Sequence, residues 1–339
     1  MRTIRWGIIG CGDVTEVKSG PGFQKATNSA LVAVMRRDGS KAQDYAKRHD
    51  VPRWYDSAEA LIGDGEVDAV YVATPPQFHE HYTMLTAEAG KPVYVEKPMA
   101  RSFPECQRMV SACQSAGVPL FVAYYRRCLP RFLKVKELLD GGAIGDVRFV
   151  SVTLYQPPSA DELSGDAGRR PWRVDPTIAG GGKFVDLASH TLDLLDHFFG
   201  PILYASAGGR AKNQGAHYSA EDIVASDFEF KSGIVGTGVW CFSAATHADR
   251  VEIVGSKGTM TFASFANDPV RVTNASGTQD FQVDHPPHVQ QPLIQTVVDE
   301  LIGIGRCPST GVSAARTNRV MDAMLKAWRR KTGQMMPVV

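Results

Sequence analysis

The chain has 339 residues, 43% of them hydrophobic, and a formal net charge of +1. This length exceeds the usual size of one domain, so we expect two domains that share a cleft. The balanced charge, without a long run of Lys or Arg, argues against nucleic acid or a membrane surface as a partner. The longest apolar runs, such as residues 67–75 and 118–124, are far shorter than the roughly 18 residues of a membrane span.

Cysteine and histidine usage points to a reduced protein without a metal site. The six cysteines form no CxxC pair, and the nine histidines show no ligand spacing near them. The apolar stretch at residues 7–10 is too short for the apolar core of a signal peptide. We therefore expect a cytoplasmic protein.

Short apolar runs alternate with amphipathic stretches in the first third of the chain. This alternation predicts right-handed βαβ units and a parallel sheet, so we assign residues 1–124 to an α/β, Rossmann-like nucleotide-binding domain. Helix starts are indicated by capping boxes, including Ser40 with Gln43. The predicted strands are residues 4–9, 31–35, 69–73, 93–95 and 120–123.

After Pro130 strands follow one another with little helix between them. This order predicts an α+β domain over residues 125–339, with an open-faced, mostly antiparallel sheet. An uncovered apolar sheet face is expected to meet a partner subunit, so we expect a homodimer or homotetramer through this sheet. The predicted strands are residues 146–155, 202–210, 225–230, 234–242, 249–254 and 259–262, and the predicted helices 131–139, 288–304 and 312–331.

A glycine-rich turn follows the first predicted strand. Its first two glycines match a dinucleotide-binding fingerprint, in which backbone N–H groups at a strand-to-helix turn cradle a pyrophosphate. Thr15 stands where the third glycine would permit helix packing, and an ordinary βα turn is the alternative. The segment Gly20-Pro21-Gly22 interrupts the expected helix, and Lys18 before it is a candidate for substrate selection at the cleft mouth. The candidate cofactor-binding residues of the turn are Gly10, Cys11, Gly12, Asp13 and Val14.

Two arginines, Arg36 and Arg37, follow the second predicted strand. An acid at this place binds the ribose 2′-hydroxyl of NAD, whereas a base accommodates the 2′-phosphate of NADP. The nearest acid, Asp38, comes only in the turn. The sequence therefore favours NADP, with NAD possible, and a pair of solvated turn arginines is the alternative.

The strand at residues 93–95 runs into Glu96, Lys97 and Pro98. Because strand C-termini in open α/β sheets face the ligand crevice, the Lys97 ammonium is placed to hydrogen-bond a substrate oxygen. The alternative is a surface Lys-Pro turn.

Residues 180–193 carry the most suggestive polar cluster, GGGKFVDLASHTLD. A helix beginning near Val185 would put Asp186 and His190 on one face. A carboxylate beside an imidazole fixes its tautomer and raises its basicity, as a general acid/base requires. A surface salt bridge on an amphipathic helix is the alternative.

Two smaller signals complete the set. Thr74 and Pro75 end a strand, and the helix that starts near His79 makes these three residues candidates for lining the cofactor, with a plain helix-start residue as the alternative for His79. Trp172 and Arg173 lie in the long loop before the polar cluster and offer an aromatic plane and a cation near the cleft, with a packing anchor as the alternative for the tryptophan.

In chain order, these motifs resemble the glucose-fructose oxidoreductase / inositol dehydrogenase / MocA family over nearly the whole chain. The resemblance implies a Rossmann domain, a C-terminal open-faced sheet, and NAD(P)-dependent redox chemistry on sugars, polyols or related diols. It also implies that Lys97 is the catalytic lysine, His190 the acid/base and Asp186 the assisting carboxylate. The matching stretches are GxG at the first turn, ATPPQFH, VEKP, GGGKFVDLASHTLD and VGSKGTMTF.

Other positions are assigned by the same resemblance. Glu96, Thr74 and Pro75 fall at cofactor-lining positions, and the Trp172-Arg173 pair is similar to one beside the nicotinamide in 1,5-anhydro-fructose reductases. The chain departs from the family at Ala188, commonly Gly, and at Tyr125, which replaces a common Asn. These departures bear on substrate identity.

The sequence thus predicts an NADP(H)-dependent oxidoreductase that moves a hydride between the nicotinamide and a carbinol or carbonyl carbon. A family member that cleaves glycosides with a recycled NAD is one alternative. A non-enzymatic nucleotide sensor is another, and it should have lost Lys97 or His190, which are both present.

Overall fold

The computed structural model describes residues 2–164, 166, 168, 170–206 and 210–334. The chain forms two compact units, Met1–Leu129 with His285–Ala315, and Pro130–Asp284 with Arg316–Val339. The sequence analysis placed all residues after 124 in one domain, but residues 285–315 pack into the first unit. Gln290 shows why: it is fully buried and its amide donates to the Glu96 carboxylate at 2.6 Å.

The first unit is built on a six-stranded sheet of order β3-β2-β1-β4-β5-β6, in which every pair of neighbours is parallel. This confirms the predicted Rossmann sheet. The order reverses between β1 and β4, and nucleotides bind at the carboxyl ends of strands at such a point. The strands are β1 Ile4–Ile9, β2 Ser29–Met35, β3 Arg53–Tyr55, β4 Ala69–Val72, β5 Val93–Val95 and β6 Leu120–Val122.

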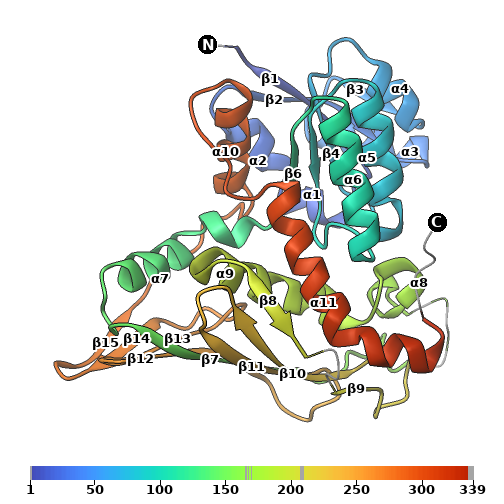
Figure 1. Cartoon of the computed structure of the whole chain (residues 1–339). Helices are drawn as coiled ribbons and strands as arrows, with labels where there is room; N and C mark the ends of the chain where they lie inside the picture. The colour runs from blue at the N-terminus through green and yellow to red at the C-terminus, as the bar shows by residue number, and fades with distance from the viewer. Residues whose placement is uncertain (1, 165, 167, 169, 207–209, 335–339) are drawn as a thin grey trace. The chain divides into compact units, whose positions relative to one another are not determined.

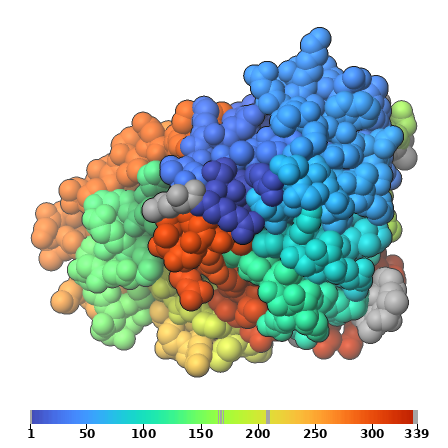
Figure 2. All heavy atoms as spheres, turned by 90° about the horizontal axis from the view of Figure 1, so that it is seen from above, coloured from blue at the N-terminus to red at the C-terminus, as the bar shows by residue number. Residues whose placement is uncertain are grey.

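Helices cover both faces of this sheet. Helices α4, α5 and α6 lie on one face, while α2 packs with α10 on the other (Figure 1). Figure 2 shows the orange-red surface of the α10 segment beside the dark blue start of the chain. The helices are α1 Asp13–Val17, α2 Gly20–Lys25, α3 Gly39–Arg48, α4 Ala58–Gly63, η1 Pro76–Phe78, α5 His79–Glu88, α6 Phe103–Ser115, η2 Tyr125–Cys128 and α10 Gln291–Leu301.

The Gly20-Pro21-Gly22 segment begins α2 and permits two close contacts. A Cβ on Gly20 would lie 2.2 Å from the Thr15 carbonyl oxygen and 2.4 Å from the Tyr45 hydroxyl. A Cβ on Gly22 would lie 2.9 Å from Ile294 Cδ1, where α2 packs on α10. These glycines therefore provide the tight helix packing that the fingerprint's third glycine ordinarily allows.

The second unit is built on a nine-stranded sheet of order β15-β14-β13-β12-β7-β11-β10-β8, with β9 paired to β10. Within this sheet, among the described residues, β7–β11 is the one parallel pair and the other pairs are antiparallel. The mostly antiparallel sheet is thus confirmed. The strands are β7 Val147–Tyr155, β8 Ile202–Ala205, β9 Arg210–Lys212, β10 Ile223–Phe230, β11 Val235–Cys241, β12 Ala248–Gly255, β13 Gly258–Phe262, β14 Val270–Asn274 and β15 Gly277–Phe281.

Three strands were not predicted, and one predicted strand is divided. Strand β3 is very short, and β14 and β15 form a largely polar edge ribbon that lacks a long apolar run. The predicted strand at residues 202–210 corresponds to β8 and the start of β9, while residues 207–209 lie outside the described residues.

Helices pack on one face of the second sheet (Figure 1). The Phe184 ring contacts Trp240 on β11 with centroids 5.1 Å apart. Side chains that alternate with Trp240 along β11 point to the other face, where Val235 and Val239 remain 48% and 37% exposed. The helical segments are α7 Pro130–Asp140, η4 Trp172–Val174, α8 Pro176–Ala179, the π-helical η5 Phe184–Ala188, α9 Ser189–Phe199 and α11 Gly311–Thr332. None of the described helices has the length and apolarity of a membrane span.

Replacement of Gly20 by Ala should destabilise the first unit. The added methyl group clashes with the Thr15 carbonyl and breaks the hydrogen bond that the Tyr45 hydroxyl donates to it at 2.8 Å. We expect a loss of about 1–3 kcal/mol, typical of overpacking, in urea unfolding. Gly63→Ala is the control, because a Cβ there meets no atom within 4 Å. Equal stability of the two variants would contradict this account.

Candidate active site

The glycine loop joins β1 to α1 and leaves room for a ligand. Gly10 has a φ of +90°, and a Cβ there would lie 2.8 Å from Thr74 Cγ2. A Cβ on Gly12 would meet no atom closer than the Gly10 carbonyl oxygen at 3.8 Å. Thr15 steadies the turn, since its hydroxyl accepts from Gly12 N at 3.0 Å and donates to Gly12 O at 2.7 Å. The Thr15 hydrogen bonds therefore fix the backbone of the loop, while the space beside Gly12 stays free of protein atoms. This arrangement suits a pyrophosphate.

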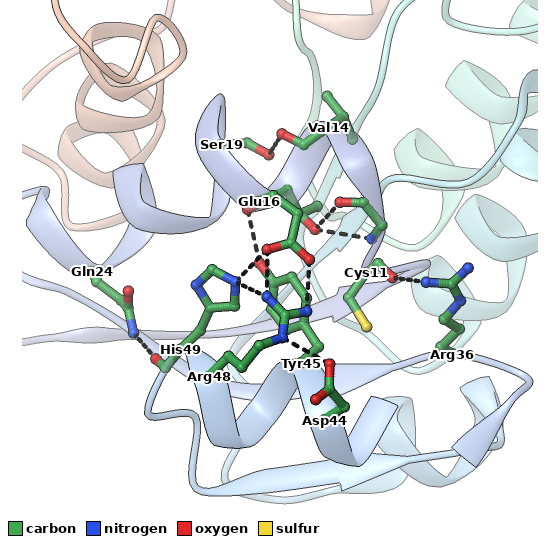
Figure 3. Close-up of polar contacts among 12 residues, drawn as sticks. Cys11, Val14, Glu16, Ser19, Gln24, Arg36, Asp44, Tyr45, Arg48 and His49 are labelled. Carbon is green, nitrogen blue, oxygen red and sulfur yellow. Dashed lines mark hydrogen bonds and ion pairs between the residues drawn. The ribbon is translucent and has the colours of Figure 1, made fainter. Parts of the chain in front are cut away.

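Short α1, which carries the predicted residues Asp13 and Val14, is tied to the end of α3 by ion pairs (Figure 3). Both terminal nitrogens of Arg48 donate to the Glu16 carboxylate at 2.8 Å, and His49 Nε2 lies 2.7 Å from the same carboxylate. The Arg48 hydrogen bonds, followed by that of His49, lower the pKa of Glu16 to about 2. Ion pairs thus link α1 to the end of α3.

The two predicted NADP-binding arginines lie at the carboxyl end of β2. Arg36 Nη1 donates to the Cys11 carbonyl at 3.4 Å, so its guanidinium lies beside the glycine loop (Figure 3). The Arg37 guanidinium lies 5.2 Å from the centre of the Phe78 ring. Both arginines are exposed.

Asp38, the nearest acid, is the N-cap of α3, where the sequence analysis placed Ser40. Its carboxylate accepts from the Ser40 hydroxyl at 2.6 Å and from Lys41 N at 3.3 Å. The Ser40 hydrogen bond is the main cause of a lowered pKa at Asp38. The acid is therefore engaged in capping while the arginines face solvent.

His79, a predicted cofactor-lining residue, is buried at the start of α5. Its side chain has 0% exposure, and Nε2 lies 2.7 Å from the Thr74 carbonyl oxygen. Nδ1 lies 3.1 Å and 3.2 Å from the carbonyl oxygens of Pro98 and Met99. Burial lowers the pKa of His79. The ring links two loops at the carboxyl edge of the sheet, and Thr74 and Pro75 line that edge beside Gly10.

Glu96 also turns into the interior, where it holds the backbone of Lys97. Its carboxylate, in a side chain only 6% exposed, accepts from Lys97 N at 3.1 Å. It also accepts from the Tyr71 hydroxyl and from Gln290 Nε2. The Lys97–Pro98 peptide is cis. Lys97 is half-buried at the carboxyl end of β5, at the edge where a nucleotide would lie.

In the second unit the segment that carries Asp186 is a π-helical turn, residues Phe184–Ala188, not the predicted α-helix. Such turns occur frequently at functional sites. His190 follows in the first turn of α9 and is 3% exposed. The Asp186 carboxylate lies 3.4 Å from Arg173 Nε, and the Arg173 guanidinium lies 4.5 Å from the centre of the Trp172 ring. The second unit therefore brings Trp172, Arg173 and Asp186 together.

Sequence reasoning missed Glu221, which holds the glycines before this turn. Its side chain is 1% exposed, and Oε1 accepts from Gly182 N at 2.8 Å. A Cβ on Gly181 would lie 3.0 Å from Oε1, and among the described residues Oε2 has no hydrogen-bond partner. Burial raises the pKa of Glu221 to about 7. No sequence pattern distinguishes this buried acid from the acids of exposed loops.

Two further contacts hold the Gly-rich segment, one before and one after the glycine that Glu221 binds. Arg329 Nη2 donates to the Gly180 carbonyl at 2.7 Å. Lys183 forms a buried ion pair with Glu162 at 3.2 Å. Three charged side chains from different parts of the second unit thus fix the backbone that leads into Asp186. Among the described residues no group of three or more metal-ligating side chains occurs.

Glu221→Gln should change the pH dependence of stability. The folded pKa of about 7 exceeds the ordinary 4.5, so the native protein gains stability at low pH and loses it as the pH rises through 7. Gln cannot ionise, so between pH 5 and pH 8 the free energy of unfolding of the variant should rise relative to that of the wild type, by up to about 3 kcal/mol. Urea unfolding at both pH values measures this gain. The exposed control Glu229→Gln should show none, and a pH-independent difference at Glu221 would contradict the assignment.

Comparison with known proteins covers both units. Residues 4–124 match "Oxidoreductase family, NAD-binding Rossmann fold", and residues 132–261 match "GFO/IDH/MocA C-terminal domain". The chain is 40% identical over 319 residues to Oxidoreductase P35 of Formosa agariphila, covering 94% of this chain and 97% of that protein. It is 30% identical to trans-1,2-dihydrobenzene-1,2-diol dehydrogenase of Mus musculus, covering 75% and 73%.

A solved structure shows the same fold. Levoglucosan dehydrogenase in complex with NADH and levoglucosan superposes with a TM-score of 0.84 at 21% identity, covering 97% of this chain and 98% of that one. The likeness extends through both the nucleotide-binding sheet and the second, mostly antiparallel sheet.

Proposed function

Because the chain belongs to the GFO/IDH/MocA family of NAD(P)-dependent oxidoreductases, we propose that it transfers a hydride between NADP(H) and a CH–OH carbon of a sugar, polyol or related diol. The observation that carries the proposal is Lys97, which Glu96 fixes at the carboxyl end of β5. Similar proteins named for a dihydrodiol and for levoglucosan support the substrate class.

The glycine loop fits a dinucleotide. Gly12 leaves space above the turn, and Gly10 adopts a φ of +90° that brings the loop against Thr74. When bound, the nicotinamide accepts or delivers the hydride. Thr74 and Pro75, at the carboxyl end of β4, would line its pocket.

Three side chains would act on the substrate hydroxyl. The Lys97 ammonium would donate a hydrogen bond to the reacting oxygen and stabilise the negative charge that develops on it during hydride transfer. His190 removes the hydroxyl proton during oxidation and returns it during reduction. Asp186 orients the substrate and stabilises the charge on the imidazole, while Arg173 holds Asp186 in place.

The arrangement at the end of β2 supports NADP as the cofactor. Arg36 lies at the glycine loop and Arg37 stacks on Phe78, so two exposed guanidiniums are available to a 2′-phosphate. Asp38, which would favour NAD, is engaged as a helix cap.

The outer face of the second sheet supports self-association. Val235 and Val239 are exposed on the same face of β11, and Val235 pairs in register with Phe149 on β7. We propose that this face contacts a second copy in a homodimer or homotetramer.

The cysteines are free thiols, which agrees with a cytoplasmic location.

Lys97→Ala and His190→Ala should each lower kcat by about 10²-fold or more, as for loss of a positioned acid/base group. The assay follows NADPH formation or consumption with sugars, polyols and dihydrodiols. Lys47→Ala and His81→Ala, both at exposed positions, are the controls. Near-normal turnover in either site variant would remove that residue from the mechanism. Release of a sugar leaving group without net nucleotide consumption would instead indicate glycoside cleavage.

Arg36→Ala should weaken NADPH binding by about tenfold or more, since a hydrogen bond between charged groups contributes about 1.5–3 kcal/mol. NADH binding should change little, because it lacks the 2′-phosphate. Fluorescence titration of both nucleotides measures the difference. Arg306→Ala, at a side chain 91% exposed, is the control. An unchanged NADPH preference would show that Arg36 does not select the cofactor.

A further inference from the structure

A loop after β13 places an aromatic ring against His190. The rings of Phe265 and His190 have centroids 5.8 Å apart and an interplanar angle of 79°. This edge-to-face arrangement is favourable for aromatic pairs. Phe265 is only half-buried, whereas its neighbours Ala263 and Ser264 are buried. Phe265 thus keeps some exposure in a loop that contacts the proposed acid/base.

A carboxylate fixes the backbone of this loop. Asp249, at the start of β12, accepts hydrogen bonds from the N–H groups of Ser264 at 2.9 Å, Phe265 at 2.6 Å and Ala266 at 2.9 Å. Bonds from backbone N–H groups to an ionised acceptor are among the stronger ones in proteins. Asp249 thus determines the direction in which Phe265 leaves the sheet.

A buried cation holds the same loop from its other end. Arg131 on α7 has 0% exposure, and its guanidinium donates to the Ala266 carbonyl and to the Asn267 side chain. Burying a guanidinium is costly unless it is paired or hydrogen-bonded. Two charged residues from different elements therefore stabilise one short loop whose tip is Phe265.

The loop is also tied directly to α9. The hydroxyls of Ser264 and Thr191 are hydrogen-bonded at 2.9 Å. Ser264 precedes Phe265 and Thr191 follows His190, so this bond fixes the two rings relative to one another. The aromatic contact is consequently a built feature of the second unit and not the chance position of a mobile ring.

We propose that Phe265 is a specificity-determining residue that gives the substrate an apolar wall beside His190. Resting on the proposed function, this assigns a cyclic substrate, in which the reacting carbinol carbon belongs to a ring with an apolar C–H face. Such a face can pack flat against an aromatic ring, whereas an open-chain polyol presents hydroxyl groups on every side. Apolar contacts of this size discriminate between substrates by about 10–200-fold.

The test compares ring and open-chain alcohols. Initial rates with NADP⁺ are measured for levoglucosan, myo-inositol and trans-cyclohexane-1,2-diol, and for the open-chain polyols sorbitol and glycerol. The wild type should have its highest kcat/KM with a cyclic compound. Phe265→Ala should lower that kcat/KM by about tenfold or more, mainly through a raised KM. Rates with the open-chain compounds should change less than about threefold, because these compounds would not pack against the Phe265 ring.

Controls separate this role from a structural one. Phe281→Ala, at a half-buried ring on β15, should leave both substrate classes unchanged. Phe265→Leu keeps an apolar side chain and serves if the alanine variant fails to fold. It should lose selectivity for rings while the pH profile of kcat, which depends on His190, stays in place.

Three outcomes would overturn the assignment. These are a wild-type preference for open-chain polyols, an equal loss with both classes in the Phe265 variants, or no loss at all. Turnover of open-chain alcohols alone would leave the dehydrogenase function standing and overturn only the role of Phe265. Absence of NADP⁺ or NAD⁺ reduction with every alcohol would overturn the proposed function together with it.

Discussion

The hydrogen bond from Lys97 N to the buried Glu96 carboxylate is the contact on which the first unit's part of the site depends. Glu96 is kept in the interior by Tyr71 and Gln290, so β5 ends in a fixed position. The same device recurs in the second unit. Glu221 accepts from Gly182 N just before the π-helical turn, and Asp249 accepts from the N–H of Phe265. In each case a carboxylate accepts a hydrogen bond from a backbone N–H and so fixes the chain at, or just before, a residue of the proposed site.

Much of the fold could be predicted because buried strands are visible in the sequence as short runs of apolar residues. The strands of the first sheet that lie between neighbours follow continuous buried runs, and β1 and β5 have the predicted bounds. Edge strands such as β3 and β15 escaped, because a strand that is short or exposed on both sides needs no apolar pattern. The π-helical turn escaped as well, since its hydrogen bonding depends on contacts of the preceding glycines with distant residues.

The candidate site was predictable in its residue types but not in their orientation. Motif matching selected Lys97, Asp186 and His190, and the structure puts Lys97 at a strand end and the other two on one helical segment. It selected His79 equally, although that ring is turned inward to backbone carbonyls. A histidine that binds a ligand and one that ties two loops together look alike in a sequence. Only burial and partners separate them.

The discontinuous first unit affects the order in which the protein can mature. Residues 285–315 belong to this unit, yet the ribosome makes them after most of the second. Until Gln290 emerges, the Glu96 carboxylate lacks one of its buried donors and α2 lacks the helix against which Gly22 packs. Both units are therefore completed only by the last part of the chain, the first by residues 285–315 and the second by residues 316–339. The second unit waits in the same way for Arg329, which donates to the Gly180 carbonyl.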